Sequence, residues 1–512
     1  MIVSRPRDIS RRAFVLGAAA GAAISAAGAK VPADARDMRA MSGLCDLSAV
    51  DAVAHMAQGA LSAERYAQAL IARCRAAHAL NAFITFDPAK VLEDARSRDL
   101  ERLAGRKPGP LFGLPIPVKD SVNTRDYPTT AGTPALRNFH PKEDAPLVAT
   151  LRKSGALVLG KTNLHELSYG WTSNNPAFGA VHNPYAPWRI PGGSSGGTAA
   201  AIAARLAPLG VAEDTEGSIR VPAAFCGIAG FRPTTGRYST RGCVPISPLF
   251  DQVGPLARSV GDLALFDSVA AGDRRKLDTV TLEGVRLGIV RDYFFTDLDP
   301  EILRLTELAL ARLKDAGAQI IETRLPGLAA LIERTTDAVQ NHDVRLALAA
   351  YLTEYHAGID FDTLVARASP DIQRVFRSDV LPGGVNFVTE AMYADARDRH
   401  LPALRRLYVD YFDHAKVAAM IFPATLVPAP RIGEETTVDA GGRALPFETA
   451  VARNIAPGST AGLPGLVLPV GLTREGLPAA IELDAPARAD RALLALGAAL
   501  EGVLGTGAPP RT

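Results

Sequence analysis

The stretch from Pro110 to Pro255 constrains the fold more than any other part of the chain. Within it, short apolar runs such as Ala156–Leu159 and Leu206–Ala212 alternate with glycine- and serine-rich turns and with short helical segments. A short apolar run bounded by turns is typical of a buried strand, and helices between such strands cover the faces of a sheet. The stretch therefore predicts an α/β fold in which helices surround a sheet.

The flanking segments extend this architecture. Apolar residues recur three and four apart in Ala60–Cys74, which predicts a helix within an N-terminal helical layer over residues 47–104. Further elements are expected beyond residue 255: strands over Val285–Val290, Ala418–Pro423 and Gly465–Val470, a helix over Glu301–Ala316, and helices over residues 328–415. A chain of 512 residues is long enough to bury a large core around these elements.

The first 29 residues have the pattern of an export signal. Arg11 and Arg12 precede an Ala- and Gly-rich apolar stretch that ends in Ala27-Gly28-Ala29. The stretch is about 15 residues long, too short to cross a bilayer of about 30 Å as a helix. It predicts a cleavable twin-arginine signal, read by the twin-arginine export machinery, and a periplasmic or secreted protein. A second small-residue site, Ala33–Ala35, leaves the cleavage position open.

Charge and cysteine content exclude several classes of protein. The formal net charge is +2, and the four arginines and one aspartate of residues 1–29 leave about −1 for the rest. Nucleic-acid binding needs clustered Lys and Arg, so it is not expected. Four cysteines without a CxxC spacing predict neither a disulfide framework nor zinc, although a single bridge stays open. There is no HExxH motif, and we expect no metal or cofactor.

One motif match is rejected on structural grounds. Gly155–Thr162 fits the phosphate-loop pattern letter for letter. A phosphate-binding loop needs its middle residues in an open backbone nest. Here those residues are Ala-Leu-Val-Leu, the expected buried strand, so nucleotide binding is not predicted.

A second match places Ser194 in a special turn. Gly192–Gly196 fits the nucleophile-elbow pattern Gly-x-Ser-x-Gly, and the helical segment Thr198–Arg205 follows it. The elbow would need a histidine partner, and none of the later histidines lies in a distinctive loop setting: His342, His356, His400 and His414. The elbow alone is weak support for catalysis.

A second serine occupies an equally special position. Ser218 lies in Glu213–Ala223, directly after the apolar run that ends at Ala212. A strand that stops before a tight Gly-Ser turn leaves backbone N–H groups unpaired, and such donors are what an oxyanion hole requires. Ser218 is therefore a candidate nucleophile.

A serine nucleophile needs a base, and Lys119 is the candidate. It follows the apolar, proline-stiffened run Phe112–Val118. Burial lowers the pKa of a lysine, and the neutral amine can then accept a proton. On spacing alone, a surface ion pair between Lys119 and Asp120 is the more ordinary interpretation.

Taken together, these three segments resemble the amidase signature family. The resemblance covers residues 46–505 as one amidase domain and includes the late segment Asn454–Gly471. It implies a twisted mixed central β-sheet surrounded by helices. It implies that Lys119 is the base, Ser194 a bridging serine next to a cis peptide, and Ser218 the nucleophile that forms the acyl-enzyme.

The resemblance also assigns the residues around the nucleophile. Backbone N–H groups from Thr215 through Glu216 and Gly217 to Ser218 would bind the oxyanion, while Asp214 and Arg220 would hold the loop. Two features depart from the family. Its usual glycine is replaced by Glu216, and an export signal is uncommon in it.

Glu216 raises two questions about the site. If its position requires positive φ, a non-glycine residue costs about 1 kcal/mol or more. A carboxylate beside a developing oxyanion would also oppose it unless Arg220 or solvent neutralises the charge. Alternatively, Glu216 binds a cationic group of the substrate.

The resemblance indicates a small-molecule amide substrate. The segments His165–Gly179 and Phe231–Thr240 look most like those of hydrolases of arylacetamides, such as mandelamide or indoleacetamide. Residues 328–415 correspond to the variable, substrate-side part of the family. They contain aromatic residues of which some are expected to line an acyl pocket, although each also suits a core: Tyr351, Tyr355, Phe361, Phe376 and Phe387.

Two other functions remain open on the sequence. The same three residues would hydrolyse an ester or a carbamate, and Glu216 could mark a catalytically inactive periplasmic binding protein. An amidotransferase subunit is disfavoured, because its partners are cytoplasmic and this chain carries an export signal. The oligomeric state is left open, a homodimer included.

Overall fold

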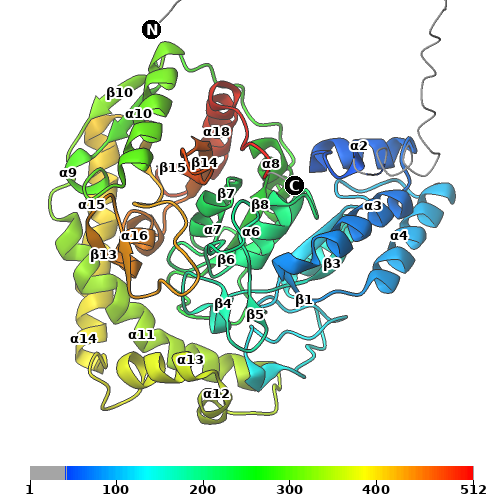
Figure 1. The fold of residues 1–512 in the computed structure, drawn as a ribbon, viewed down its shortest axis with the longest axis horizontal. Helices are drawn as coiled ribbons and strands as arrows, with labels where there is room; N and C mark the ends of the chain where they lie inside the picture. Colours follow the sequence, from blue (N-terminus) through cyan, green and yellow to red (C-terminus); the bar gives the residue numbers. More distant parts are fainter. Residues whose placement is uncertain (1–40, 42, 511–512) are drawn as a thin grey trace, which may run out of the picture. The chain divides into compact units, whose positions relative to one another are not determined.

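A mixed sheet of eleven strands runs through the part of the chain that the structure describes (Figure 1). The computed structural model describes Met41 and residues 43–510. The strand order is β1-β3-β2-β6-β8-β7-β14-β15-β11-β9-β10. The bounds are β1 (Phe83–Thr85), β2 (Pro115–Lys119), β3 (Leu157–Thr162), β6 (Leu209–Asp214), β7 (Ala229–Arg232), β8 (Gln252–Ala257), β9 (Arg286–Ile289), β10 (Gln319–Glu322), β11 (Ala419–Pro423), β14 (Gly465–Leu472) and β15 (Pro478–Asp484). The predicted α/β fold is confirmed.

Strand direction changes across the sheet. β2 runs parallel to β3 and β6, the strands from β6 through β8, β7, β14 and β15 to β11 pair antiparallel, and β9 is parallel to β11 and β10. Val118 of β2 lies opposite Val211 of β6. Because these two strands are parallel, their carboxyl ends reach the same edge of the sheet. This edge carries both Lys119 and the loop after Asp214.

Helices lie on both sides of the sheet and in a separate group (Figure 1). Local signals define their ends: Ser48 accepts the Asp51 N–H at the start of α2, and Asp299 and Pro300 begin α10. The helices are α2 (Ala49–Gln58), α3 (Ala63–Ala76), α4 (Pro88–Leu103), α5 (Pro146–Lys153), α6 (Gly196–Ala203), α7 (Arg220–Phe225), α8 (Val260–Ala270), α9 (Arg291–Phe294), α10 (Pro300–Asp315), α11 (Leu328–Glu354), α12 (Phe361–Arg367), α13 (Pro370–Val375), α14 (Glu390–Asp395), α15 (Leu401–Ala415), α16 (Phe447–Ala452), α17 (Ala456–Ala461) and α18 (Asp490–Leu504).

The expected elements are found with shifts of a few residues. The apolar runs predicted as strands form β3, β6, β9, β11 and β14, and the predicted helices correspond to α3, α10 and the group α11 to α15. Residues 1–29, predicted to be the export signal, lie outside the described residues, so that assignment stays a prediction.

Helices α11 to α15 form the yellow-green group along the lower and left edge of Figure 1. Their core cluster, which includes Tyr351, Phe361 and Phe376, is shared with buried residues of loops beside the sheet, at positions 131–139, 167 and 244–246. The short hairpin strands β12 (Thr437–Asp439) and β13 (Ala444–Pro446) precede α16. This group of helices thus packs against those loops, and a cavity lies between it and the loop that follows β6.

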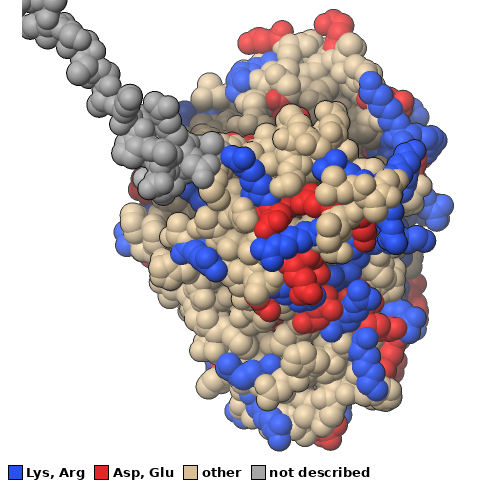
Figure 2. Space-filling view, turned by 90° about the vertical axis from the view of Figure 1, so that its right-hand side faces the viewer, with Lys and Arg blue, Asp and Glu red and all other residues tan. Residues whose placement is uncertain are grey.

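The surface and the cysteines show ordinary features. On the face drawn in Figure 2, basic and acidic side chains are interspersed. Among the described residues, no helix is long and apolar enough to cross a membrane.

All four cysteines are buried and unpaired, so the single bridge that the sequence left open does not form.

Candidate active site

Lys119 ends β2 inside the protein. Its side chain is fully buried, and Nζ lies 2.6 Å from Ser194 Oγ and 2.7 Å from Glu213 Oε1. Burial lowers the pKa of Lys119, and the nearby Glu213 carboxylate opposes this effect. The amine therefore lies between a hydroxyl and a carboxylate in a water-poor site.

The expected surface pair between Lys119 and Asp120 is wrong. Asp120 is also fully buried, and its carboxylate pairs instead with Lys161 Nζ at 3.0 Å. Lys161 lies in β3 within the segment that matched the phosphate-loop pattern. Asp120, the first residue after β2, thus reaches a partner different from that of Lys119.

Ser194 lies in a tight turn before α6. The peptide bond between Gly193 and Ser194 is cis. Ser173 Oγ donates to the carbonyl of Gly192 at 2.9 Å and accepts the Gly196 N–H at 3.0 Å, which fixes both sides of the turn. A Cβ on Gly197 would lie 2.3 Å from the Asn163 carbonyl oxygen, so the start of α6 requires glycine there.

The nucleophile-elbow interpretation finds no partner for Ser194. The Oγ of this fully buried serine contacts Lys119, and no histidine side chain in the described part of the chain contacts it. The later histidines bind elsewhere: His342 contacts Glu390, His400 contacts Asp395, and His414 contacts the Asp410 carbonyl.

Ser218 lies in the loop that follows β6 and is 5% exposed at the surface of a cavity. The N–H groups of Thr215, Glu216 and Ser218 meet no acceptor among the described residues. The Gly217 N–H differs, because it donates to Asp214 Oδ1 at 2.8 Å. Three of the four expected oxyanion donors are thus available, and Gly217 is not one of them.

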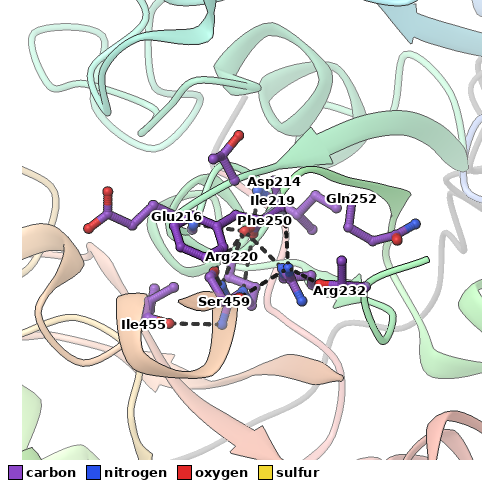
Figure 3. A network of polar contacts seen from close by, with 12 residues as sticks. Asp214, Glu216, Ile219, Arg220, Arg232, Phe250, Gln252, Ile455 and Ser459 are labelled. Atoms are coloured by element: carbon purple, nitrogen blue, oxygen red, sulfur yellow. Dashed lines mark hydrogen bonds and ion pairs between the residues drawn. The ribbon is translucent and has the colours of Figure 1, made fainter. Parts of the chain in front are cut away.

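Asp214 and Arg220 anchor this loop (Figure 3). Asp214 accepts the Ile219 N–H at 3.0 Å and Arg220 Nε at 3.1 Å, and Arg232 Nε lies 3.4 Å away. Burial would raise the pKa of Asp214, but Arg220 and Arg232 outweigh it and hold the pKa below its usual range. Arg220 also contacts Glu482 and the Ile455 carbonyl. The loop is therefore held by buried charges that neutralise one another.

Glu216 does not place backbone strain on the loop, because its φ is not positive. Positive φ falls on Gly217, at 111°, and Glu216 is not among the described non-glycine residues with positive φ. A Cβ on Gly217 would lie 2.8 Å from Ile455 Cγ2, so glycine is needed at that position.

Arg220 does not neutralise Glu216. Figure 3 shows the Glu216 side chain pointing away from Arg220 and Arg232. Its Oε2 accepts Gln340 Nε2 at 3.0 Å, while its backbone carbonyl accepts Trp171 Nε1 at 3.1 Å. Burial, and next the Asp337 carboxylate, raise the pKa of Glu216 well above its usual range.

Several residues of the site were not foreseen from the sequence. Glu213 bonds the amine of Lys119, and Ser173 and Trp171 hold the two turns. Glu213 stands within the segment that marked Ser218, but nothing in the local pattern shows that its side chain points toward β2. Strand alternation offers the only signal, since Glu213 precedes the loop on the end of β6.

A cavity of about 840 Å³ opens over Ser218. Tyr169, Trp171, Phe387 and Phe447 contribute aromatic surface to it. Of the five aromatic residues expected to supply an acyl pocket, only Phe387 lines this cavity. Tyr351, Phe361 and Phe376 belong to a core cluster, and Tyr355 packs against it. No group of His, Cys, Asp or Glu in the described part of the chain has the arrangement of a metal site.

Comparison with known proteins agrees with this geometry. A family model described as "Amidase" matches residues 65–494. The chain is 38% identical to indoleacetamide hydrolase of Agrobacterium vitis, over 85% of this chain and 92% of that protein. It is 36% identical to mandelamide hydrolase of Pseudomonas putida, over 94% and 96%. A solved amidase structure matches with a TM-score of 0.80 and 31% identity, over 90% of this chain and all of that one.

Proposed function

The chain belongs to the amidase family and is an amide-hydrolysing enzyme, and we propose that it cleaves a carboxamide of aryl or arylacetamide type through an acyl-enzyme on Ser218. One observation carries the proposal. The amine of Lys119, fully buried, lies 2.6 Å from Ser194 Oγ, in the turn adjoining the Ser218 loop. The Ser195 N–H, 3.3 Å from the Ser218 carbonyl, joins the two turns.

The first half of the reaction forms the acyl-enzyme. Ser218 Oγ attacks the amide carbonyl, its proton passes to Ser194 Oγ, and the Ser194 proton passes to the lone pair of neutral Lys119. Throughout this step, Lys119 keeps its hydrogen bond to the Glu213 carboxylate. The free N–H groups of Thr215, Glu216 and Ser218 supply the oxyanion donors. Lys119 then returns its proton through Ser194 to the leaving nitrogen, the C–N bond breaks, and the amine departs.

The second half regenerates the enzyme. Water attacks the Ser218 ester and gives its proton to Lys119 through Ser194. The tetrahedral intermediate collapses, Ser218 Oγ regains the proton, and the carboxylic acid leaves. The aromatic side chains of the cavity, Trp171 and Phe447 among them, provide apolar surface for an aryl group.

Amide turnover tests this function. We expect the purified protein to release ammonia from phenylacetamide or indole-3-acetamide, and Ser218→Ala to lower kcat/KM by more than about a thousandfold. Ser97→Ala, on the exposed side of α4, is the matched control and keeps full activity. Equal ammonia release by the Ser218→Ala and Ser97→Ala proteins would contradict the proposal.

We also propose that residues 1–29 direct twin-arginine export, on the support of Arg11-Arg12 and the short apolar stretch that follows. In a host with this export machinery, the full chain is expected in the periplasm in shortened form, as measured by cell fractionation and mass. The double variant Arg11→Lys with Arg12→Lys should abolish export to the periplasm. The double variant Arg5→Lys with Arg7→Lys should leave export unchanged. Periplasmic recovery that is the same for both variants would refute it.

A further inference from the structure

Most of the charged residues that line the cavity over Ser218 are acids. Three of these acids are Glu216, Asp337 and Glu448. Four more carboxylates also line the cavity: Glu333, Asp371, Asp379 and Glu435. Against these seven acids stands one arginine, Arg374, and one histidine, His165. A cavity lined by one sign of charge attracts ligands of the other sign.

No lysine, arginine or histidine in the described part of the chain forms an ion pair with the first three acids. Among the ion pairs of the described residues, none involves Glu216, Asp337 or Glu448. One amide serves two of them, because Gln340 Nε2 donates to Glu216 Oε2 at 3.0 Å and to Asp337 Oδ1 at 3.1 Å. Arg220, the nearest basic residue in sequence, is bound to Asp214 and Glu482.

The electrostatics of this trio reflect the missing counter-charge. Burial, and next the repulsion from Asp337, raise the pKa of Glu216 well above its usual range. Glu216 is half-buried and Asp337 and Glu448 are exposed, so a cation brought by a ligand can reach all three carboxylates.

An independent observation also points to a ligand at this cavity. Ser168 lines it, is 3% exposed, and its Oγ has no hydrogen-bond partner among the described residues. Ser168 has φ 59° and the preceding Leu167 has φ 52°, so the backbone is held in an unusual conformation at this point. This hydroxyl at the lining of the cavity offers a hydrogen-bonding group to a polar atom of a ligand.

The chemistry of the cavity identifies the cation as organic. The described acids form no group arranged to hold a metal ion. Tyr169, Trp171 and Phe387 lie among them and offer aromatic faces, which attract ammonium and guanidinium groups. Aromatic faces and carboxylates in one cavity fit a ligand with an apolar body and a charged nitrogen.

We propose that the preferred substrate is a cationic amide, with an ammonium or guanidinium group that binds between Glu216, Asp337 and Glu448. This rests on the amide hydrolysis proposed above and assigns the substrate class of the same site. Glu216 and Ser218 line the same cavity, so one ligand can place its positive charge beside Glu216 and its amide at Ser218. The glutamate that replaces the usual glycine of the family at position 216 thus recognises the cationic group of the substrate.

A matched pair of amides tests the proposal: 4-(aminomethyl)phenylacetamide, which is cationic, and 4-ethylphenylacetamide, its neutral isostere. Both are titrated calorimetrically into the Ser218→Ala protein, so that affinity is read without turnover. We expect the cationic amide to bind at least about tenfold more tightly, since hydrogen bonds between charged groups are the stronger kind. Equal binding, or tighter binding of the neutral amide, would overturn the proposal.

Variants locate the effect. Asp337→Asn in the same background should reduce the preference for the cationic amide to near unity, and Glu448→Gln should reduce it in part. Glu354→Gln, on the exposed end of α11 and outside the cavity, should retain it. A preference that persists fully in Asp337→Asn would place the cation elsewhere and refute the assignment.

The two proposals fail separately. If the parent protein hydrolyses neither amide while Ser218→Ala still binds the cationic one preferentially, the proposed hydrolysis fails and the recognition of a cation stands. If the parent hydrolyses both amides and the two dissociation constants agree, hydrolysis stands and the cationic preference is refuted.

Discussion

The protonation state of one buried amine governs the proposed reaction. Only neutral Lys119 accepts a proton, so activity should fall as the pH drops below the pKa of this lysine. Burial lowers that pKa, whereas the Glu213 carboxylate, 2.7 Å from Nζ, raises it. Glu213 therefore acts as a positioning residue that also sets the pH range of the base.

Glu213→Gln should move the acidic limb of kcat/KM to lower pH. Glutamine keeps an oxygen that accepts the Lys119 hydrogen bond but removes the negative charge, so the pKa of Lys119 falls further and the neutral amine persists at lower pH. The measurement is the pH profile of kcat/KM for phenylacetamide.

A remote carboxylate provides the control for this profile. Glu354→Gln should leave the limb where it is, because Glu354 is on the surface, paired with Arg241. If Glu213→Gln lowers the plateau without moving the limb, Glu213 has only a structural role and the account of the base is wrong.

At the scale of elements, the sequence predicts the individual strands that position the site residues. It does not predict how these strands pair with one another. Apolar runs mark β3, β6 and β14, because a buried strand requires them. The run before Lys119 forms β2, all of whose residues are buried. The predicted burial of this lysine follows from that local pattern alone.

Which side chains meet across strands could not be predicted. Lys119 and Glu213 are 94 positions apart, and their contact depends on the parallel register of β2 and β6. Asp120 pairs with Lys161 for the same reason, through β3. Local spacing favoured the neighbouring pair Lys119 and Asp120, because no sequence pattern encodes the register.

The loop after β6 shows a second limit of the sequence. Its Gly-Ser turn predicts unpaired N–H groups, and three of them are unpaired in the described structure. The Gly217 N–H is lost to Asp214, whose position depends on Arg220 and Arg232 from two different elements. The sequence also did not predict that the positive φ of this turn falls on Gly217 and not on Glu216, because either position could have adopted it.

At the scale of the whole molecule, the cavity is assembled from segments that are distant in sequence. Glu216 follows β6, Asp337 belongs to α11 and Glu448 to α16. Each of these acids alone resembles a surface residue. Only the packing of α11 and α16 beside the sheet edge brings them together over Ser218, so the sequence suggests a role for Glu216 without revealing its companions.

The central claim is that Ser218 is the activated nucleophile, and a serine-reactive fluorophosphonate tests it most directly. After exposure to this probe, the intact mass of the parent protein should increase by one adduct, and peptide mapping should place it on Ser218. The Ser218→Ala protein should remain unlabelled, and Lys119→Ala should label slower by about a hundredfold or more. An adduct on Ser194, or equal labelling of the parent and Ser218→Ala proteins, would contradict the account.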